Sequence, residues 1–237
     1  MVKVSMTTHL HPQRSFARLL AAGAGLAVGA WTVVAGTAWL RYGHAPAGRA
    51  DERDDLLDRF IPLYDVVERH HIRVAAPAAV TLLAAQEQDF QRLPAIRAIF
   101  KTRELVLGST PVAAPDSTLF AQVQAFGWGI LAEIPGREVV LGAVTKPWEP
   151  NPTFRALPPS EFAAFNEPGF VKIAWTLRAD PVDEHRSVFR TETRAVATDS
   201  FARAKFRRYW AFVSPGVAAI RRLSLRPLKR VAERRAS

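Results

Sequence analysis

Three charged side chains alternate along one predicted strand and form a candidate site for an anionic ligand. Arg190, Glu192 and Arg194 stand two residues apart, so an extended backbone places all three on the same face. If that face lines a cavity, the two guanidinium groups are suited to bind a ligand carboxylate or phosphate, with Glu192 orienting them. If the face points to solvent, the trio is a charge ladder that contributes little to stability.

Aromatic side chains supply a second set of candidates. Large rings provide apolar area that holds a lipid-like or polycyclic ligand mainly by burial, at about 25 cal/mol for each Å² removed from water. The same rings would fill a solid core equally well, with no ligand. The rings that we take as candidate cavity lining are Trp128, Trp148, Phe154, Trp175, Tyr209 and Trp210.

Patterns for catalysis or metal binding are sparse. The chain has no cysteine, so disulfides, thiolate ligands and thiol nucleophiles are excluded. Among the histidines, His9 and His11 lack the three or four converging ligands that zinc needs, and His70 is the one candidate for acid–base work. The sequence contains no glycine-rich phosphate loop and no Ser-His-Asp spacing. We therefore expect no metal and no cofactor, and we favour binding over catalysis.

Positive charge is concentrated at the C-terminal end of the 237-residue chain. The formal net charge is +10, and residues 201–237 carry 11 basic residues and one acidic residue, so this segment accounts for all of it. Nucleic acid is not an expected partner, because the aromatic residues of the segment follow its apolar stripe and do not alternate along the basic face. Anionic lipid headgroups suit the basic face, and a purely solvated face is the alternative.

A membrane anchor is predicted near the N-terminus. Residues 19–40 carry no charge, and at about 1.5 Å per residue a helix of this length spans a hydrocarbon core of about 30 Å. Arg18 and Arg41 flank the segment in the positions of interfacial anchors. A cleavable signal peptide is the alternative, although its apolar core would be shorter. If the basic C-terminal segment lies on an anionic leaflet, the large domain is cytoplasmic.

Periodicity and turn residues predict the elements that position these candidates. Alternation predicts strands, helical spacing after a proline predicts helices, and Pro135-Gly136 predicts the turn of a hairpin. Asp199 is a suitable N-cap for a long final helix, which Pro215 must bend. The predicted elements are a strand at 66–75, helices beginning at Pro77 and Pro94, a hairpin within 119–145, a short helix at 160–165, strands at 170–179 and 187–198, and a helix after residue 199.

Several of these segments resemble the START/Bet v 1-like superfamily of polyketide cyclases and lipid-transport proteins. The resemblance is carried by His71–Val80, Glu138–Gly142, Pro168–Trp175, Thr191–Arg194, Phe206–Trp210 and Ser214–Gly216. It implies an α+β helix-grip fold, in which a curved antiparallel sheet wraps around a long C-terminal helix and encloses a cavity. A transmembrane helix before this domain is not part of the general family pattern.

The sequence therefore predicts a tail at 1–18, a transmembrane helix at 19–40, a linker at 41–63 and a helix-grip domain at 64–237. We expect a membrane-tethered domain that binds or carries a hydrophobic, lipid-like small molecule in an internal cavity. One alternative is a cyclase/aromatase-like enzyme in which Arg190, Glu192 and His70 act on a polyketide-like substrate. Another is a structural protein with a filled core.

Overall fold

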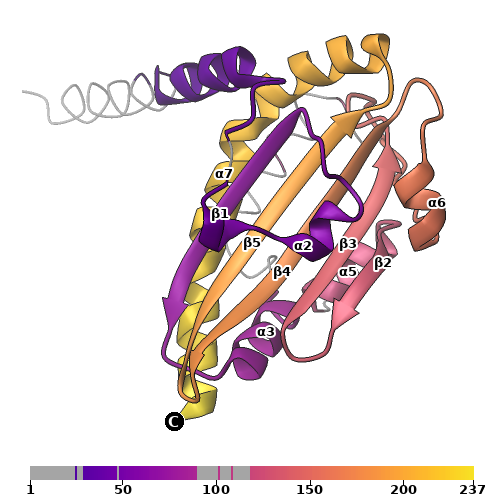
Figure 1. Ribbon diagram of the computed structural model, residues 1–237. Helices are drawn as coiled ribbons and strands as arrows, with labels where there is room; N and C mark the ends of the chain where they lie inside the picture. Colours follow the sequence, from indigo (N-terminus) through magenta and orange to yellow (C-terminus); the bar gives the residue numbers. More distant parts are fainter. Residues whose placement is uncertain (1–24, 26–28, 47, 90–100, 102–107, 109–117) are drawn as a thin grey trace, which may run out of the picture.

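A five-stranded antiparallel sheet forms the centre of the protein (Figure 1). The computed structural model describes residues 25, 29–46, 48–89, 101, 108 and 118–237. The strands are arranged in the order β1-β5-β4-β3-β2. Their bounds are β1 Val66–Val74, β2 Gly129–Ile134, β3 Glu138–Thr145, β4 Val171–Asp183 and β5 Arg186–Ala197.

The two hairpins differ in how closely they follow the sequence prediction. The β2–β3 turn falls at residues 135–137 as expected, and Gly136 adopts a φ of +69° there, which glycine accepts without strain. The first stretch of the predicted hairpin is wrong at its start, because residues 119–125 form a helix and β2 begins only at Gly129. The loop expected at 180–185 is shorter than predicted, because β4 continues to Asp183 and β5 begins at Arg186. Asp183 accepts a hydrogen bond from the His185 backbone N–H at 2.9 Å and pairs with Arg186 at 2.6 Å, which closes the hairpin locally.

Most of the predicted helices are confirmed where the structure describes the chain. Helix α3 (Ala78–Gln86) begins directly after Pro77, and α7 (Ser200–Ala236) begins after Asp199, whose carboxylate accepts a hydrogen bond from the Ala202 N–H at 2.6 Å. The helix predicted to begin at Pro94 lies outside the described residues. The other helical segments are η1 (Ala50–Glu52), α2 (Asp55–Asp58), α5 (Leu119–Ala125) and α6 (Pro159–Ala164).

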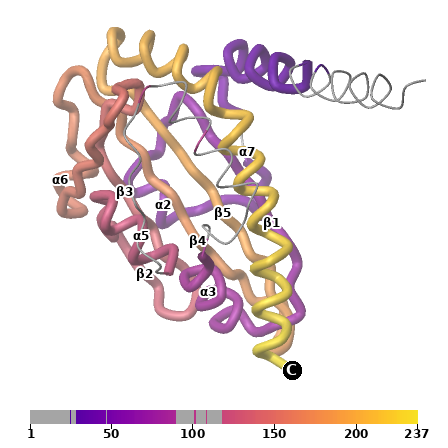
Figure 2. The backbone as a smooth tube through the Cα atoms, turned by 180° about the vertical axis from the view of Figure 1, so that it is seen from behind, coloured from indigo at the N-terminus to yellow at the C-terminus, as the bar shows by residue number. Residues whose placement is uncertain are grey.

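Helix α7 covers one face of the sheet, which we call the α7 face. Its first turns cross one end of the sheet and the remainder runs along the face (Figures 1 and 2). Pro215 and Pro227 lie within the helix, and each removes a backbone N–H from its hydrogen-bond ladder. The core on this side includes residues of α3, α5, the strands and the second half of α7, among them Leu82, Leu119, Val139, Leu141, Trp175, Leu177, Phe189 and Leu228.

The opposite side, which we call the outer face, is also covered. Leu57 in α2 and Ile61 after it are fully buried, although they belong to the segment predicted as a linker. Together with Phe60 they pack against β3 and against Phe162 of α6, and the Phe60 and Phe162 rings lie 6.3 Å apart. We call residues 50–64 the outer strap. The sheet therefore has a second apolar core beneath this strap and α6.

A further helical stretch, residues 29–41, lies against the first half of α7. The Trp31 and Phe212 rings are 6.3 Å apart, and the Arg207 guanidinium lies 4.2 Å from the Trp39 ring and donates to the Trp39 carbonyl at 3.0 Å. Within the described residues, every helix falls short of the length or apolar content that a membrane crossing requires. The predicted transmembrane helix at 19–40 lies partly outside those residues, because 19–24 and 26–28 are not described.

Candidate functional site

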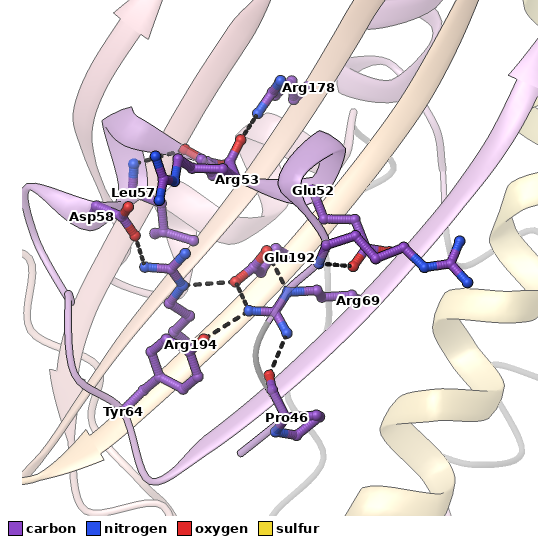
Figure 3. Close-up of polar contacts among 12 residues, drawn as sticks. Pro46, Glu52, Arg53, Leu57, Asp58, Tyr64, Arg69, Arg178, Glu192 and Arg194 are labelled. Carbon is purple, nitrogen blue, oxygen red and sulfur yellow. Dashed lines mark hydrogen bonds and ion pairs between the residues drawn. The ribbon is translucent and has the colours of Figure 1, made fainter.

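The predicted charged trio of β5 lies on the outer face, under the strap. Figure 3 shows two of its members, Glu192 and Arg194, with their partners. Glu192 accepts hydrogen bonds from Arg69 at 2.9 Å and from Arg194 at 2.6 Å. Arg194 also donates to Asp58 of α2 and to the Ile61 carbonyl, and its side chain is only 4% exposed. Burial opposes its charge, but the hydrogen bonds and charges of Glu192 and Asp58 hold the pKa of Arg194 above its ordinary value.

Arg190 belongs to a neighbouring ion network on the same face. It pairs with Asp180 of β4 at 3.1 Å and with Asp51 of η1 at 3.0 Å. A cavity of about 20 Å³ lies between this network and the strap, with room for about one water molecule. The trio is thus neither a solvated ladder nor part of the α7 face, because the chain's own carboxylates and carbonyls occupy its guanidinium groups. A ligand role for these residues stays a prediction.

A carboxyl pair beneath the strap was not predicted from the sequence. Glu138 of β3 is 4% exposed, and its Oε1 has no hydrogen-bond partner among the described residues. Asp54 is also buried and accepts a hydrogen bond from the Leu57 N–H at 2.8 Å, which caps α2. Burial, and next the charge and hydrogen bond of Asp54, raise the pKa of Glu138 to about 8, although Arg178 acts in the opposite direction. Glu138 therefore holds a proton at neutral pH.

On the α7 face, three of the predicted aromatic residues form a continuous row. The Trp128 ring stacks on Phe154 at 5.5 Å and meets Trp175 edge-on at 6.5 Å. The Trp175 indole N–H donates to the Thr191 hydroxyl at 2.6 Å, which fixes the orientation of that ring. Gly127 makes the stack possible, because it has a φ of +90° and a Cβ there would lie 2.1 Å from the Phe154 carbonyl oxygen.

The other three predicted rings form a separate group beneath the first half of α7. Tyr209 and Trp210 pack against Phe206, whose ring centre lies 6.3 Å from that of Tyr209 and 6.0 Å from that of Trp210, and Trp148 packs against the same cluster. The structure therefore divides the predicted site into three places. The aromatic row and the Trp210 group share the α7 side, and the charged trio lies on the other side of the sheet.

Arg221 adds a cation to the aromatic row, and the sequence analysis did not single it out. Its guanidinium lies 4.1 Å from the centre of the Trp175 ring and donates to the Thr193 hydroxyl at 3.1 Å. Burial lowers the pKa of Arg221 to about 10, while the charge of Glu68 acts in the opposite direction. The group therefore stays charged at neutral pH, between a sheet and a helix that are otherwise largely apolar.

A signal for Arg221 does exist in the sequence. The side chains of α7 that face the sheet after Pro215 include Val217, Ser224 and Leu228, and Arg221 falls on the same stripe at helical spacing. Helical spacing of apolar residues alone predicts a stripe that continues through Leu223, but Leu223 is 45% exposed. Because this segment contains ten other basic residues, the sequence did not distinguish Arg221 as the one that faces the sheet.

His70 lies on the α7 face, on the strand next to the one that carries Thr191 and Thr193. In the β1–β5 register it stands opposite Thr191, and Glu68 stands opposite Thr193. The His70 Nε2 atom lies 3.3 Å from the Glu68 carboxylate. Arg190 and Glu192 point to the outer face, so the structure does not bring them and His70 to one point as a cyclase-like site would require. Within the described part of the chain, no group of three or more acidic or histidine side chains is arranged to hold a metal ion.

Fold and site together define an α+β protein with a five-stranded antiparallel sheet and a long C-terminal helix, an arrangement consistent with the helix-grip class. No protein-family model and no curated protein matches the sequence.

Among solved structures, a hypothetical protein from Helicobacter pylori is similar at 6% identity and a TM-score of 0.36, over 81% of this chain and 99% of that one. A norcoclaurine synthase variant from Thalictrum aligns at 13% identity and a TM-score of 0.27, over 72% of this chain and 96% of that one. An aromatase/cyclase from Streptomyces aligns at 14% identity and a TM-score of 0.23, over 72% of this chain and 95% of that one. These TM-scores are too low for any conclusion about function to rest on them.

Proposed function

We propose that this chain is a membrane-tethered binding or carrier protein for a hydrophobic, lipid-like small molecule, held between the sheet and α7. The observation that supports it is the row of Trp128, Phe154 and Trp175 on the α7 face, where large rings are held in fixed orientations. Rings of this size contribute apolar area for binding a ligand mainly by burial.

The space beside the row sets a condition on binding. A cavity of about 10 Å³ lies between Trp175, Leu177, Phe189 and Leu228, which is about the size of one water molecule. A lipid-like ligand cannot enter this cavity without separating α7 from the sheet at this point. We therefore expect binding to move the second half of α7 and to change the environment of Trp175.

The proposed tether is supported by the surface formed by residues 29–41 and the first turns of α7. Large apolar side chains are exposed there, with Leu40 at 74% and Phe201 at 61%. Basic residues lie in the same turns of α7. Exposed apolar and aromatic residues beside basic ones are typical of surfaces that contact an anionic lipid leaflet. The basic residues of these turns are Arg203, Lys205, Arg207 and Arg208.

Ligand binding is tested with the purified full-length chain. Organic extracts of the protein are analysed by mass spectrometry, and binding of the neutral fluorescent probe N-phenyl-1-naphthylamine is titrated. Trp128→Leu is expected to weaken probe binding roughly tenfold, because it removes the central ring of the row. Phe165→Leu is the matched control, since it removes a partly buried ring on the outer face. Failure of the wild-type chain to bind the probe or to retain any apolar compound would overturn the proposal.

Tethering and orientation are tested in cells. A membrane-spanning anchor is expected to keep the chain in the membrane pellet after alkaline carbonate extraction, whereas a chain held only by charge would be released. The chain has no cysteine, so Ser237→Cys provides a single labelling site. A membrane-impermeant maleimide is expected to label this site only after the cells are opened, if the large domain is cytoplasmic. Labelling of intact cells would contradict that orientation.

A further inference from the structure

Among the described residues, Arg221 has no acidic side chain as an ion-pair partner, unlike the other arginines that are buried or partly buried against the sheet. Arg69, Arg190 and Arg194 each pair with at least one carboxylate on the outer face. Arg221 donates one hydrogen bond, to the uncharged Thr193, and rests on the Trp175 ring. No ion pair joins it to any described residue. Toward the residues that the structure describes, the Arg221 guanidinium therefore uses only a small part of its hydrogen-bonding capacity.

Glu68 is the acidic side chain whose charge acts on Arg221, but it does not neutralise that group. Its carboxylate lies 3.3 Å from the His70 ring nitrogen, and it forms no ion pair with Arg221. A guanidinium has five N–H groups arranged as a fork that fits a carboxylate, and Thr193 accepts from only one of them. Arg221 is partly buried, and holding a cation away from water without a carboxylate partner is costly, so an anion bound at this position would be stabilised.

The cavity beside Arg221 shows where such an anion would lie. The residues that line it, besides Arg221, include Trp175, Thr191, Leu119, Leu228, Gln88 and Ser224. Its volume of about 10 Å³ admits roughly one ligand oxygen before α7 moves. From this point the aromatic row leads away through Trp175 to Trp128. Arg221 and Trp175 both line this cavity, so a cation lies directly beside the first ring of the aromatic row.

We infer that the bound molecule is an amphipathic carboxylic acid, whose carboxylate pairs with Arg221 and whose apolar part lies against Trp175 and Trp128. This inference rests on the proposed function and names the class of its ligand. The carboxylate accepts two hydrogen bonds from the guanidinium fork, and the apolar part replaces contacts between α7 and the sheet. Thr193 keeps the guanidinium in position in the free protein.

The test compares an acid with an alcohol of the same chain length. Dodecanoic acid and dodecan-1-ol are used to displace N-phenyl-1-naphthylamine from the full-length chain, at one fixed concentration of a non-ionic detergent. The wild-type chain is expected to bind the acid roughly 10- to 100-fold more tightly than the alcohol, as charge-assisted hydrogen bonds allow. Arg221→Gln is expected to abolish this ratio, Arg221→Lys to keep part of it, and Glu68→Gln to increase it. Arg222→Gln is the matched control, because Arg222 is its exposed neighbour.

Each outcome separates the inference from the function on which it rests. Equal binding of acid and alcohol by the wild-type chain would overturn the inference and leave the proposed function standing. A preference for the acid that survives in Arg221→Gln, or that is lost equally in Arg222→Gln, would also overturn it. If neither compound displaces the probe and the probe itself does not bind, the proposed function fails. A melting temperature measured for every variant shows that each is folded, and Arg221→Lys provides the test if Arg221→Gln is not.

Discussion

Glu138→Gln is expected to remove most of one pH dependence from the stability of the protein. In the folded protein the pKa of Glu138 is raised to about 8, whereas in the unfolded chain it has its ordinary value of 4.5. Between these values the unfolded chain releases the proton and the folded protein keeps it. Rising pH therefore favours unfolding, and the contribution of the protonated group, complete below pH 4.5, is lost by about pH 8.

The magnitude follows from the same two values. For an isolated group the difference between 4.5 and about 8 corresponds to roughly 5 kcal/mol. Because part of this shift depends on the neighbouring Asp54 and Arg178 side chains, we expect about 2 kcal/mol from Glu138 alone. The variant should thus be more stable than the wild type by about 2 kcal/mol at pH 8.5 and equal to it near pH 4.5.

The assay is urea unfolding followed by tryptophan fluorescence at several pH values between 4.5 and 9. Glu133→Gln is the matched control, because Glu133 is an exposed glutamate on the neighbouring strand β2. That variant should follow the wild-type curve. If the free energy of unfolding of Glu138→Gln falls with pH as steeply as that of the wild type, the carboxyl pair under the strap does not carry the proton that we assign to it.

Three further predictions concern stability. Arg194→Leu should lower the free energy of unfolding by about 3 kcal/mol, because the buried Glu192 keeps only Arg69 as a cation, Asp58 loses its partner and the Ile61 carbonyl loses a donor. Arg155→Leu, which removes an exposed pair, should cost less than about 1 kcal/mol, and equal losses in urea unfolding would contradict this reasoning. Gly127→Ala should destabilise by about 2 kcal/mol or more and reduce the near-UV circular dichroism signal, since its Cβ would collide with the Phe154 carbonyl. Asp199→Ala should cost about 1 kcal/mol by removing the cap of α7, measured as a lower melting temperature.

The elements that the sequence predicted well are those specified by local patterns. Alternation along β4 and β5, the proline before α3 and the capping aspartate before α7 each depend on neighbouring residues only. The hairpin at residues 180–185 was less well predicted, because its tight turn depends on the pairing of Asp183 with Arg186. Such a side-chain contact does not change the alternation of apolar and polar residues from which strands are predicted.

The candidate site was harder to predict, because alternation shows which residues share a face but not what covers that face. Neither face of β5 is plainly apolar, so the sequence could not assign Arg190, Glu192 and Arg194 to a side. The structure decides this through residues 50–64, a charge-rich segment that resembles a spacer in sequence but buries Leu57 and Ile61. Its contacts with β5 span more than a hundred residues of sequence.

The outer strap determines how short a working fragment of this protein can be. A chain cut at Tyr64 would keep all five strands and α7, yet it would expose the apolar surface of Val140 and Phe162 to water. It would also strip Arg194 of the Asp58 carboxylate and the Ile61 carbonyl. Such a fragment is expected to aggregate on expression, whereas a fragment that begins before Arg49 should not aggregate. Anyone trimming the N-terminus for crystallisation should therefore stop ahead of the strap.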